Sequence, residues 1–418
     1  MKDTIVRARS LLFATTALTF SVIIATVSVQ ADPSAVPIAL STAATQVAEV
    51  PLSPHMPSID GQAGAGLSTA QGQYALFGNP AGFSSPTLTF SALSTGAWLT
   101  LRPLDSLPTL WDLLTSRNLG LSGIAGSLSS EYGAQGLGAG ASALIGLSGR
   151  GFGLGLSAVS EAYFYGANSS SLAGEVQTEI AVTGGFALRT RLFGTDFSVG
   201  VDARPFARIH AVLSSADSER VLSQVVAGNV GLGLLSSVPT LNGYGVAFDT
   251  GVQLKSGALT FGLQVRDIGG TRINYAAQEF QTVLDYIGRG GLPPTTYASV
   301  ADVSAVDYVV PMRIGAGLSY QPDFGGVARF LRAEMFLDVL DFVPVLAGSS
   351  ALLDTVRIGT HITLLSFLDL YGGIGVNYYS AGFGIHLAGF ELGIAGYQQE
   401  GTGASRNSGL SVHASLQF

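Results

Sequence analysis

The last nine residues of the chain are Leu410-Ser411-Val412-His413-Ala414-Ser415-Leu416-Gln417-Phe418, and they alternate between apolar and polar side chains. Successive side chains of a β-strand point to opposite faces of the sheet, so this alternation predicts a strand with one apolar face. That face would carry Leu410, Val412, Ala414, Leu416 and Phe418. A tilted strand of about 9–11 residues is long enough to cross a lipid bilayer.

The same two-residue period recurs upstream, most clearly at residues 258–266, 312–320 and 356–364. Further candidate strands lie at 86–94, 120–129, 136–148, 151–163, 176–190, 194–204, 243–254, 327–338, 368–379, 382–388, 390–398 and 408–418. An apolar face opposite a small or polar face is typical of transmembrane strands. We therefore expect an all-β fold, a transmembrane antiparallel β-barrel of about 14 strands, within a range of 12 to 16.

The composition supports a chain that is not surrounded by water alone. Of its 418 residues, 47% are hydrophobic and only 11% are charged, whereas about a quarter of the residues of a soluble domain are charged. A soluble β-sandwich would show similar alternation, but it would carry more charge. A helical membrane protein would show several runs of about 20 apolar residues, and the only such run lies at the extreme N-terminus. The 55 glycines are spread along the chain, which suits the crowded inner wall of a twisted sheet.

The N-terminus has the layout of a secretory signal. Lys2, Arg7 and Arg9 precede an uncharged apolar stretch at 11–29, and Val29-Gln30-Ala31 offers small residues for cleavage. We expect residues 1–31 to be a signal peptide, with an uncleaved anchor helix as the alternative. Without them, 17 basic and 27 acidic residues remain, a net charge of −10 with Lys255 as the single lysine. A chain of this charge is not expected to bind nucleic acid.

Short and long connections are expected to alternate between the strands. Lys255-Ser256-Gly257 and Ser366-Phe367 are predicted to be short turns. Residues 103–119, 205–241 and 267–309 are predicted to be long extracellular connections, with helical character at 107–114 and 278–287. Residues 32–63, in contrast, are rich in Pro, Ala and Ser and show no strand period.

One stretch near the N-terminus resembles a known family. Residues Gly64 to Phe83, which include Asn79-Pro80-Ala81-Gly82, resemble the start of FadL-type long-chain fatty acid transporters and of their PorV- and PorQ-like relatives. Other segments similar to these proteins are 248–251, 266–271, 357–359 and 371–375. The resemblance extends in patches over most of the chain, but no individual ligand-binding residue can be matched.

The resemblance implies a 14-stranded barrel at residues 84–418 with an N-terminal hatch, residues 32–83, folded inside the lumen. The hatch turn would consist of Asn79, Pro80, Ala81 and Gly82. The implied function is passive uptake of hydrophobic small molecules, such as long-chain fatty acids. Two alternatives stay open: a partner-binding or surface barrel of the PorV kind, and a general diffusion porin.

The terminal strand is also similar to the signal that the bacterial outer-membrane assembly machinery reads, with apolar residues at alternate positions and a terminal Phe418. The expected location is therefore the bacterial cell outer membrane. The expected partners are outer-membrane lipid, a hydrophobic small-molecule ligand and, during biogenesis, the assembly machinery.

Charged side chains on the predicted inner faces are the candidate site residues. Arg266, Arg313, Arg332, Glu334, Arg357 and Asp369 are predicted to form a polar network in the lumen. Such a network would hold the hatch, and a less favoured reading has some of its arginines contact a ligand carboxylate. The five histidines lack close metal-ligand spacing, and no Gly-x-Ser-x-Gly elbow is present. We therefore expect no catalytic residues, no metal and no cofactor.

Overall fold

The computed structural model describes residues 45–49, 51–101, 137–165, 173–192, 194–217, 220, 238–279, 306–328, 330–376, 378–400 and 406–418. Apart from Thr45, they belong to one compact unit, Gln46–Phe418. The predicted signal peptide, residues 1–31, lies outside the described residues, and so do the candidate strand at 120–129 and the connection at 103–119.

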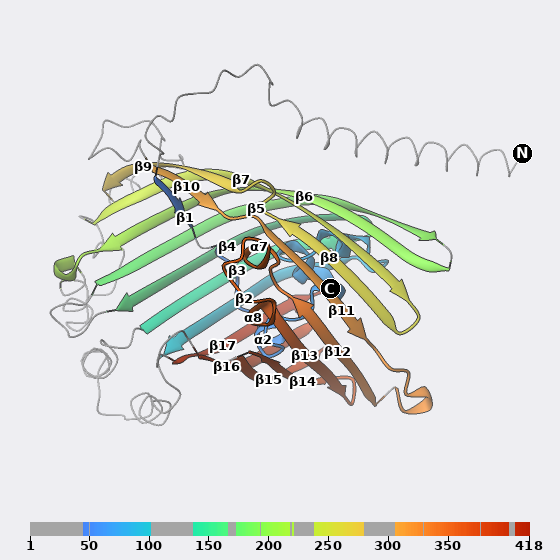
Figure 1. Cartoon of the computed structure of the whole chain (residues 1–418). Coiled ribbons are helices and arrows are strands. Elements are labelled where there is room, and N and C mark those ends of the chain that lie inside the picture. Colours follow the sequence, from blue (N-terminus) through green and yellow to red (C-terminus); the bar gives the residue numbers. More distant parts are fainter. Residues whose placement is uncertain are drawn as a thin grey trace, which may run out of the picture. The chain divides into compact units, whose positions relative to one another are not determined.

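Antiparallel strands make up most of this unit (Figure 1). The strands of the first half are β2 (Thr89–Leu101), β3 (Leu137–Gly149), β4 (Phe152–Tyr165), β5 (Ala173–Leu192), β6 (Thr195–Leu213), β7 (Pro239–Ser256), β8 (Leu259–Arg266) and β9 (Thr271–Glu279). Those of the second half are β10 (Val306–Val310), β11 (Arg313–Tyr320), β12 (Leu331–Val339), β13 (Val356–Leu364), β14 (Leu368–Gly375), β15 (Tyr378–Leu387), β16 (Phe390–Glu400) and β17 (Arg406–Gln417).

Most strands pair with the next along the chain, and the sheet closes on itself. The closure is the pairing of β17 with β2, where Val412 lies opposite Ala97. β8 pairs with β11, and β9 pairs with β10. β8 and β9 together therefore count as one strand of the wall, and β10 and β11 together count as the next. The result is a closed antiparallel barrel of 14 strands, which confirms the predicted fold class.

The predicted alternation of faces is also observed. On β17, Val412 and Leu416 are exposed on the outer face, whereas Ser411, His413 and Ser415 are buried on the inner face. The outer faces of the other strands carry exposed large apolar side chains as well, among them Leu154, Phe186, Phe261, Ile358 and Phe383. A closed barrel leaves no unpaired strand edge, and an apolar exterior suits the hydrocarbon core of a membrane.

Two predicted connections are wrong in extent. β6 continues to Leu213 and β7 begins at Pro239, so both strands run into the stretch 205–241 that was predicted to be a loop. The stretch 267–309 likewise contains β9 and β10, and Gln278 is a strand residue rather than part of a helix. The short turns at 255–257 and 366–367 are confirmed, because β7 and β13 end beside them and the next strands start directly afterwards.

A segment of short turns precedes β2, and we call residues 51–88 the inner segment. It contains α2 (Pro57–Asp60) and three 3₁₀ turns, η1 (Leu67–Thr69), η2 (Gly72–Leu76) and η3 (Pro80–Ser84). Upstream of it, β1 (Thr45–Ala48) is hydrogen-bonded to β10. Three further short elements lie in the second half: η8 (Gly325–Val327), α7 (Val343–Leu346) and α8 (Leu352–Thr355). Over the described residues, none of the helices has the length and apolar character to cross a membrane.

Because the outer-face side chains are assigned to lipid, the free-energy cost of introducing a charge there should depend on its depth in the membrane. Leu156, 50% exposed near the middle of β4, should tolerate arginine poorly, with a loss of about 2–4 kcal/mol of folding free energy. Leu387, 56% exposed at the end of β15, should lose only about 0–1 kcal/mol on the same change. Reversible unfolding in lipid vesicles measures both values, and equal costs would contradict the assignment.

Candidate functional site

The inner segment is fastened to the barrel wall at the turn Asn79-Pro80-Ala81-Gly82. The Asn79 side chain is fully buried, and its Oδ1 accepts a hydrogen bond from Ala81 N at 3.0 Å, which caps η3. Its Nδ2 donates to Val252 O at 3.1 Å and to Leu263 O at 3.2 Å. These two carbonyls belong to paired residues of β7 and β8. One amide therefore caps the turn and attaches it to two strands at once.

Carboxylate and hydroxyl groups of other strands hold the rest of the inner segment. Asp338 of β12 is buried, and its Oδ2 accepts hydrogen bonds from Gly66 N at 2.7 Å and from Leu67 N at 2.9 Å. Ser380 of β15 accepts from Ala63 N at 2.9 Å and donates to Gly61 O at 3.0 Å. Backbone groups that irregular turns leave unpaired thus find partners on the wall, as buried polar groups require.

Glycines on the inner wall leave the space that the inner segment occupies. A Cβ atom added at Gly200 of β6 would lie 2.3 Å from Pro80 O, and one at Gly373 of β14 would lie 2.4 Å from Ala63 N. Glycines in the same relation to the inner segment are found around the whole barrel: Gly96, Gly146, Gly153, Gly155, Gly185, Gly251, Gly262, Gly315, Gly359 and Gly393. At most of these positions a larger residue would overlap the inner segment, whereas at Gly96 and Gly393 the nearest inner-segment atoms would lie 3.1 Å and 3.2 Å from an added Cβ.

The ladder of the wall is interrupted close to the Asn79 turn. β7 pairs with β8 up to Thr250–Val265 and resumes with β9 at Tyr244–Asn274. The intervening residues Asp267 to Gly270 bulge out of register, and Asp267, Gly269 and Gly270 have positive φ values of 53°, 76° and 82°. On the outer face of this interruption, Ile268 and Phe248 are exposed, and Ile268 N donates to Phe248 O at 3.0 Å.

A buried charge cluster lines the inner side of the interruption. Arg204 and Asp267 are 3.2 Å apart, Arg266 and Asp249 are 3.4 Å apart, and Arg313 lies 3.8 Å from Asp267. Asp249 Oδ1 also accepts a hydrogen bond from Asp267 N at 2.7 Å, which supports the bulged backbone. Arg266 in addition donates to Phe77 O of the inner segment. The cluster therefore joins the inner segment to the interrupted part of the wall.

The six candidate residues of the polar network are divided among three places. Arg266 and Arg313 lie opposite each other on β8 and β11, in the cluster just described. Arg332, Glu334 and Asp369 line a cavity whose lining also includes residues of the inner segment. Arg357 belongs to neither group, since its Nη1 donates to Asp354 O at 2.8 Å and its guanidinium lies over the Tyr378 ring at 5.2 Å.

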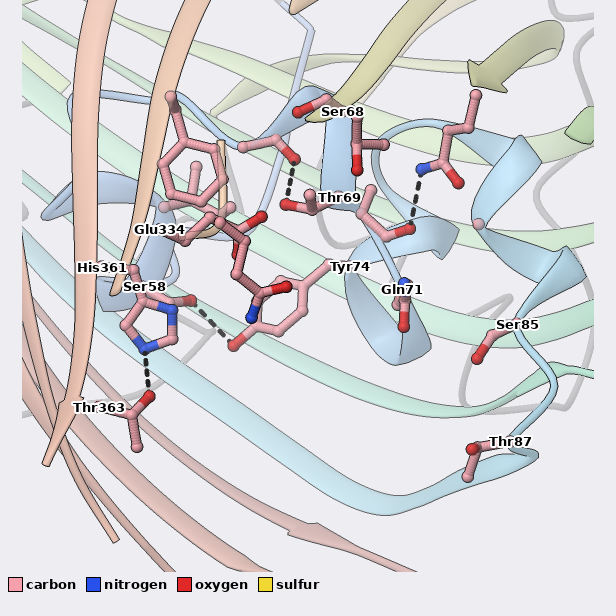
Figure 2. Close-up of a pocket in the computed structure, with 18 of the residues that line it drawn as sticks. Ser58, Ser68, Thr69, Gln71, Tyr74, Ser85, Thr87, Glu334, His361 and Thr363 are labelled. Carbon is pink, nitrogen blue, oxygen red and sulfur yellow. Dashed lines mark hydrogen bonds between the residues drawn. The ribbon is translucent and has the colours of Figure 1, made fainter. Parts of the chain in front are cut away.

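We call that cavity the vestibule. Its volume is about 780 Å³, and Lys255, Gly389 and Gln417 among its lining residues lie at the short-turn end of the barrel. Short turns face the periplasm in barrels of this kind. The inner segment contributes Ser58, Ser68, Thr69, Gln71 and Tyr74, and the wall contributes Glu334, His361 and Thr363 (Figure 2). These side chains are polar, whereas Ile59, Ala70, Pro86, Phe336 and Phe390 add apolar surface to the same lining, so the vestibule combines polar and apolar groups.

Two hydrogen-bonded groups stand out in the vestibule. Asp369 accepts from His361 Nε2 at 2.8 Å, from His386 Nδ1 at 2.6 Å and from Thr363 Oγ1 at 2.7 Å. Tyr74 accepts from Ser58 Oγ at 2.8 Å and donates to Glu391 at 3.0 Å. Burial, together with the Glu391 carboxylate, raises the pKa of Tyr74 well above its usual value, so the hydroxyl keeps the proton that it donates.

Sequence reasoning missed several residues that hold the inner segment or the interruption. Asp338, Ser380, Asp249, Asp267 and Glu391 were not predicted, although the alternation of β12 places Asp338 on the inner face. The pattern gives the face of a residue but not its height in the barrel. Height depends on the register between strands, which a single sequence does not reveal.

A closed antiparallel barrel with an apolar outer face is an outer-membrane-type transmembrane β-barrel, a protein of the bacterial outer membrane. Similar solved structures include a FadL homologue of Pseudomonas aeruginosa, with 12% identity, 88% of this chain and 98% of that chain covered, and a TM-score of 0.44. The Pseudomonas putida toluene transporter TodX has 12% identity, covers 89% of this chain and 99% of its own, and gives a TM-score of 0.43. The Ralstonia pickettii toluene transporter TbuX has 11% identity, covers 88% of this chain and 98% of its own, and gives a TM-score of 0.45.

These neighbours are FadL-type channels, the kind of protein that the sequence resembles around Asn79-Pro80-Ala81-Gly82. No protein-family model and no curated protein matches the chain in sequence.

The glycine wall predicts a specific effect of added side-chain volume. Gly200→Val should displace the Asn79 turn, because its Cβ would overlap Pro80 O, and should raise ion conductance in planar bilayers. The barrel itself should still migrate as a folded species on unheated gels. Gly184→Val is the matched control, because a Cβ there meets nothing closer than Leu154 at 4.0 Å. Equal conductance of the two variants would contradict a sealing role of the inner segment.

Proposed function

We propose that this protein lets hydrophobic small molecules cross the outer membrane passively, with the inner segment acting as a hatch. Long-chain fatty acids are the ligands that the sequence resemblance implies. In this proposal residues 32–83 are the hatch and residues 84–418 the barrel. The observation that carries the proposal is the interrupted ladder at Asp267–Gly270, next to the Asn79 turn and with apolar side chains on its outer face.

The position of the hatch supports gating rather than free diffusion. The inner segment contacts wall strands β2 to β8, β11 and β15 to β17, and Phe83 of η3 is fully buried. The contacts are single hydrogen bonds and small van der Waals surfaces rather than a covalent attachment. Each net hydrogen bond contributes only about 0.5–1.5 kcal/mol. Rearrangement of a few of them therefore needs no external energy source.

The apolar outer face of the interruption supports an exit through the wall. A hydrophobic molecule gains about 25 cal/mol for every Å² of apolar surface that leaves water. Ile268 and Phe248 are exposed on this outer face, the side that a membrane-spanning wall presents to lipid. We infer that a ligand released at the interruption leaves sideways into the bilayer and does not cross the vestibule.

The terminal strand has a separate role in the proposal. Phe90 and Phe418 exchange two backbone hydrogen bonds of 2.9 Å where the barrel closes. Leu410, Val412, Ala414, Leu416 and Phe418 would be read by the assembly machinery before this closure, while the edge of β17 is still unpaired.

Uptake into lipid vesicles tests the proposed function. Vesicles that contain the protein should take up a fluorescent long-chain fatty acid faster than empty vesicles, with saturation at high ligand concentration and without an ion gradient. Vesicles that contain an unrelated barrel porin are the control for leakage. The proposal is wrong if protein and control vesicles take up the probe at the same rate.

A reversible cross-link tests the exit route. The chain contains no cysteine, so the pair Phe248→Cys and Ile268→Cys would introduce the only two thiols, on either side of the interruption. Oxidation should slow fatty acid uptake and reduction should restore it, because the disulfide prevents separation of the two strands. The matched control is Ala97→Cys with Val412→Cys, a directly paired couple at the β2–β17 seam. A side exit is excluded if both cross-links leave uptake unchanged.

A further inference from the structure

The vestibule has a composition that the uptake of hydrophobic molecules does not explain. Glutamine side chains are frequent in its lining, and they come from both the inner segment and the wall: Gln62, Gln71, Gln253, Gln321 and Gln417. Each primary amide both donates and accepts hydrogen bonds in one plane. Hydroxyl groups of Ser58, Thr69, Thr260 and Thr363 add further donors and acceptors. A ligand that matches this lining needs many groups that each donate and accept hydrogen bonds.

The fixed charges of the vestibule favour neither an anion nor a cation. Its basic side chains are Arg189, Lys255 and Arg332, and its carboxylates are Asp196, Glu334, Asp369 and Glu391. Arg189 is paired with Asp196 at 2.8 Å, and Asp369 is bonded to two histidines. The remaining charges are Lys255, Arg332, Glu334 and Glu391, two of each sign. An ion of either sign would therefore meet a like charge, whereas a neutral polar molecule would not.

A further feature of the lining suits an organic ligand. The aromatic residues Tyr74, Phe336 and Tyr371 also line the vestibule, so apolar ring surface lies among the polar groups.

We propose that the vestibule binds a neutral polyhydroxylated ligand, a glycan of about disaccharide size, from the periplasmic side. A sugar ring has hydroxyl groups that donate and accept around its edge and C–H groups on its faces. The edge matches the amides and carboxylates, and the faces match the aromatic rings. The volume of about 780 Å³ lies within the range of about 300–1,000 Å³ that small-molecule sites occupy.

Titration with two neutral disaccharides tests this site. Full-length protein is kept in an amine-oxide detergent, because detergents with sugar head groups would compete for the site. Maltose and N,N′-diacetylchitobiose are added, and binding is followed by saturation-transfer NMR and by calorimetry. At least one of the two should bind saturably. The inference is overturned if neither disaccharide shows saturable binding at millimolar concentration.

Matched variants place the binding. Gln71→Ala and Gln321→Ala should each weaken the binding about fivefold, the factor that corresponds to one net hydrogen bond. Both residues line the vestibule and are exposed, so both variants should fold normally, which the gel shift on heating checks. Asn274→Ala on the exposed face of β9 should bind as the unmodified protein does. Unchanged binding by both vestibule variants would overturn the site.

This inference does not depend on the proposed uptake function, and the two can fail separately. Saccharide binding without fatty acid uptake would support the vestibule site and reject the proposed function. Uptake without saccharide binding would support the proposed function and reject the vestibule site.

Discussion

The rest of the structure depends on the contact between an irregular inner segment and the barrel wall that surrounds it. Short 3₁₀ turns leave many backbone N–H and C=O groups without a partner inside their own segment, and burial makes these groups costly. The wall supplies partners for several of them. Asp338 accepts two N–H groups, Ser380 bonds one N–H and one C=O, and Asn79 reaches two carbonyls. The glycine content follows from the same constraint, since the turns approach the wall closely enough to exclude a Cβ atom.

The interruption of the ladder follows from a related requirement. Backbone that leaves the register at Asp267 loses the partners that a regular strand provides, and it must recover them locally. Asp249 accepts the N–H of Asp267, while Thr271 Oγ1 donates to Asp267 Oδ1 at 3.0 Å. A carboxylate buried in this way needs a cation nearby, which explains Arg204 and Arg266. The charge cluster is thus a consequence of the interruption, and through Phe77 O it also contacts the inner segment.

Period-2 alternation was sufficient to predict the strands at 258–266 and 356–364 and the direction of their side chains, because lipid outside and a polar lumen inside impose opposite requirements. It failed for β9 and β10. On β9 the exposed residues are Arg272 and Asn274, whereas Ile273 is buried, so polar residues lie outside and an apolar residue inside. Alternation also could not group the candidate site residues. Arg313 and Arg332 both belong to wall strands, but register separates the buried cluster from the vestibule.

The inner segment contacts two places of different chemistry. On one side the interruption lies beside the Asn79 turn, with Ile268 and Phe248 exposed on its outer face. On the other side the vestibule is bordered by amides, hydroxyls and balanced charges. A hydrophobic ligand and a polar one would therefore not compete for the same space, although both would contact the same segment. Occupation of the vestibule would add a partner to Gln71 of the inner segment, and additional partners would stabilise the hatch in its present position.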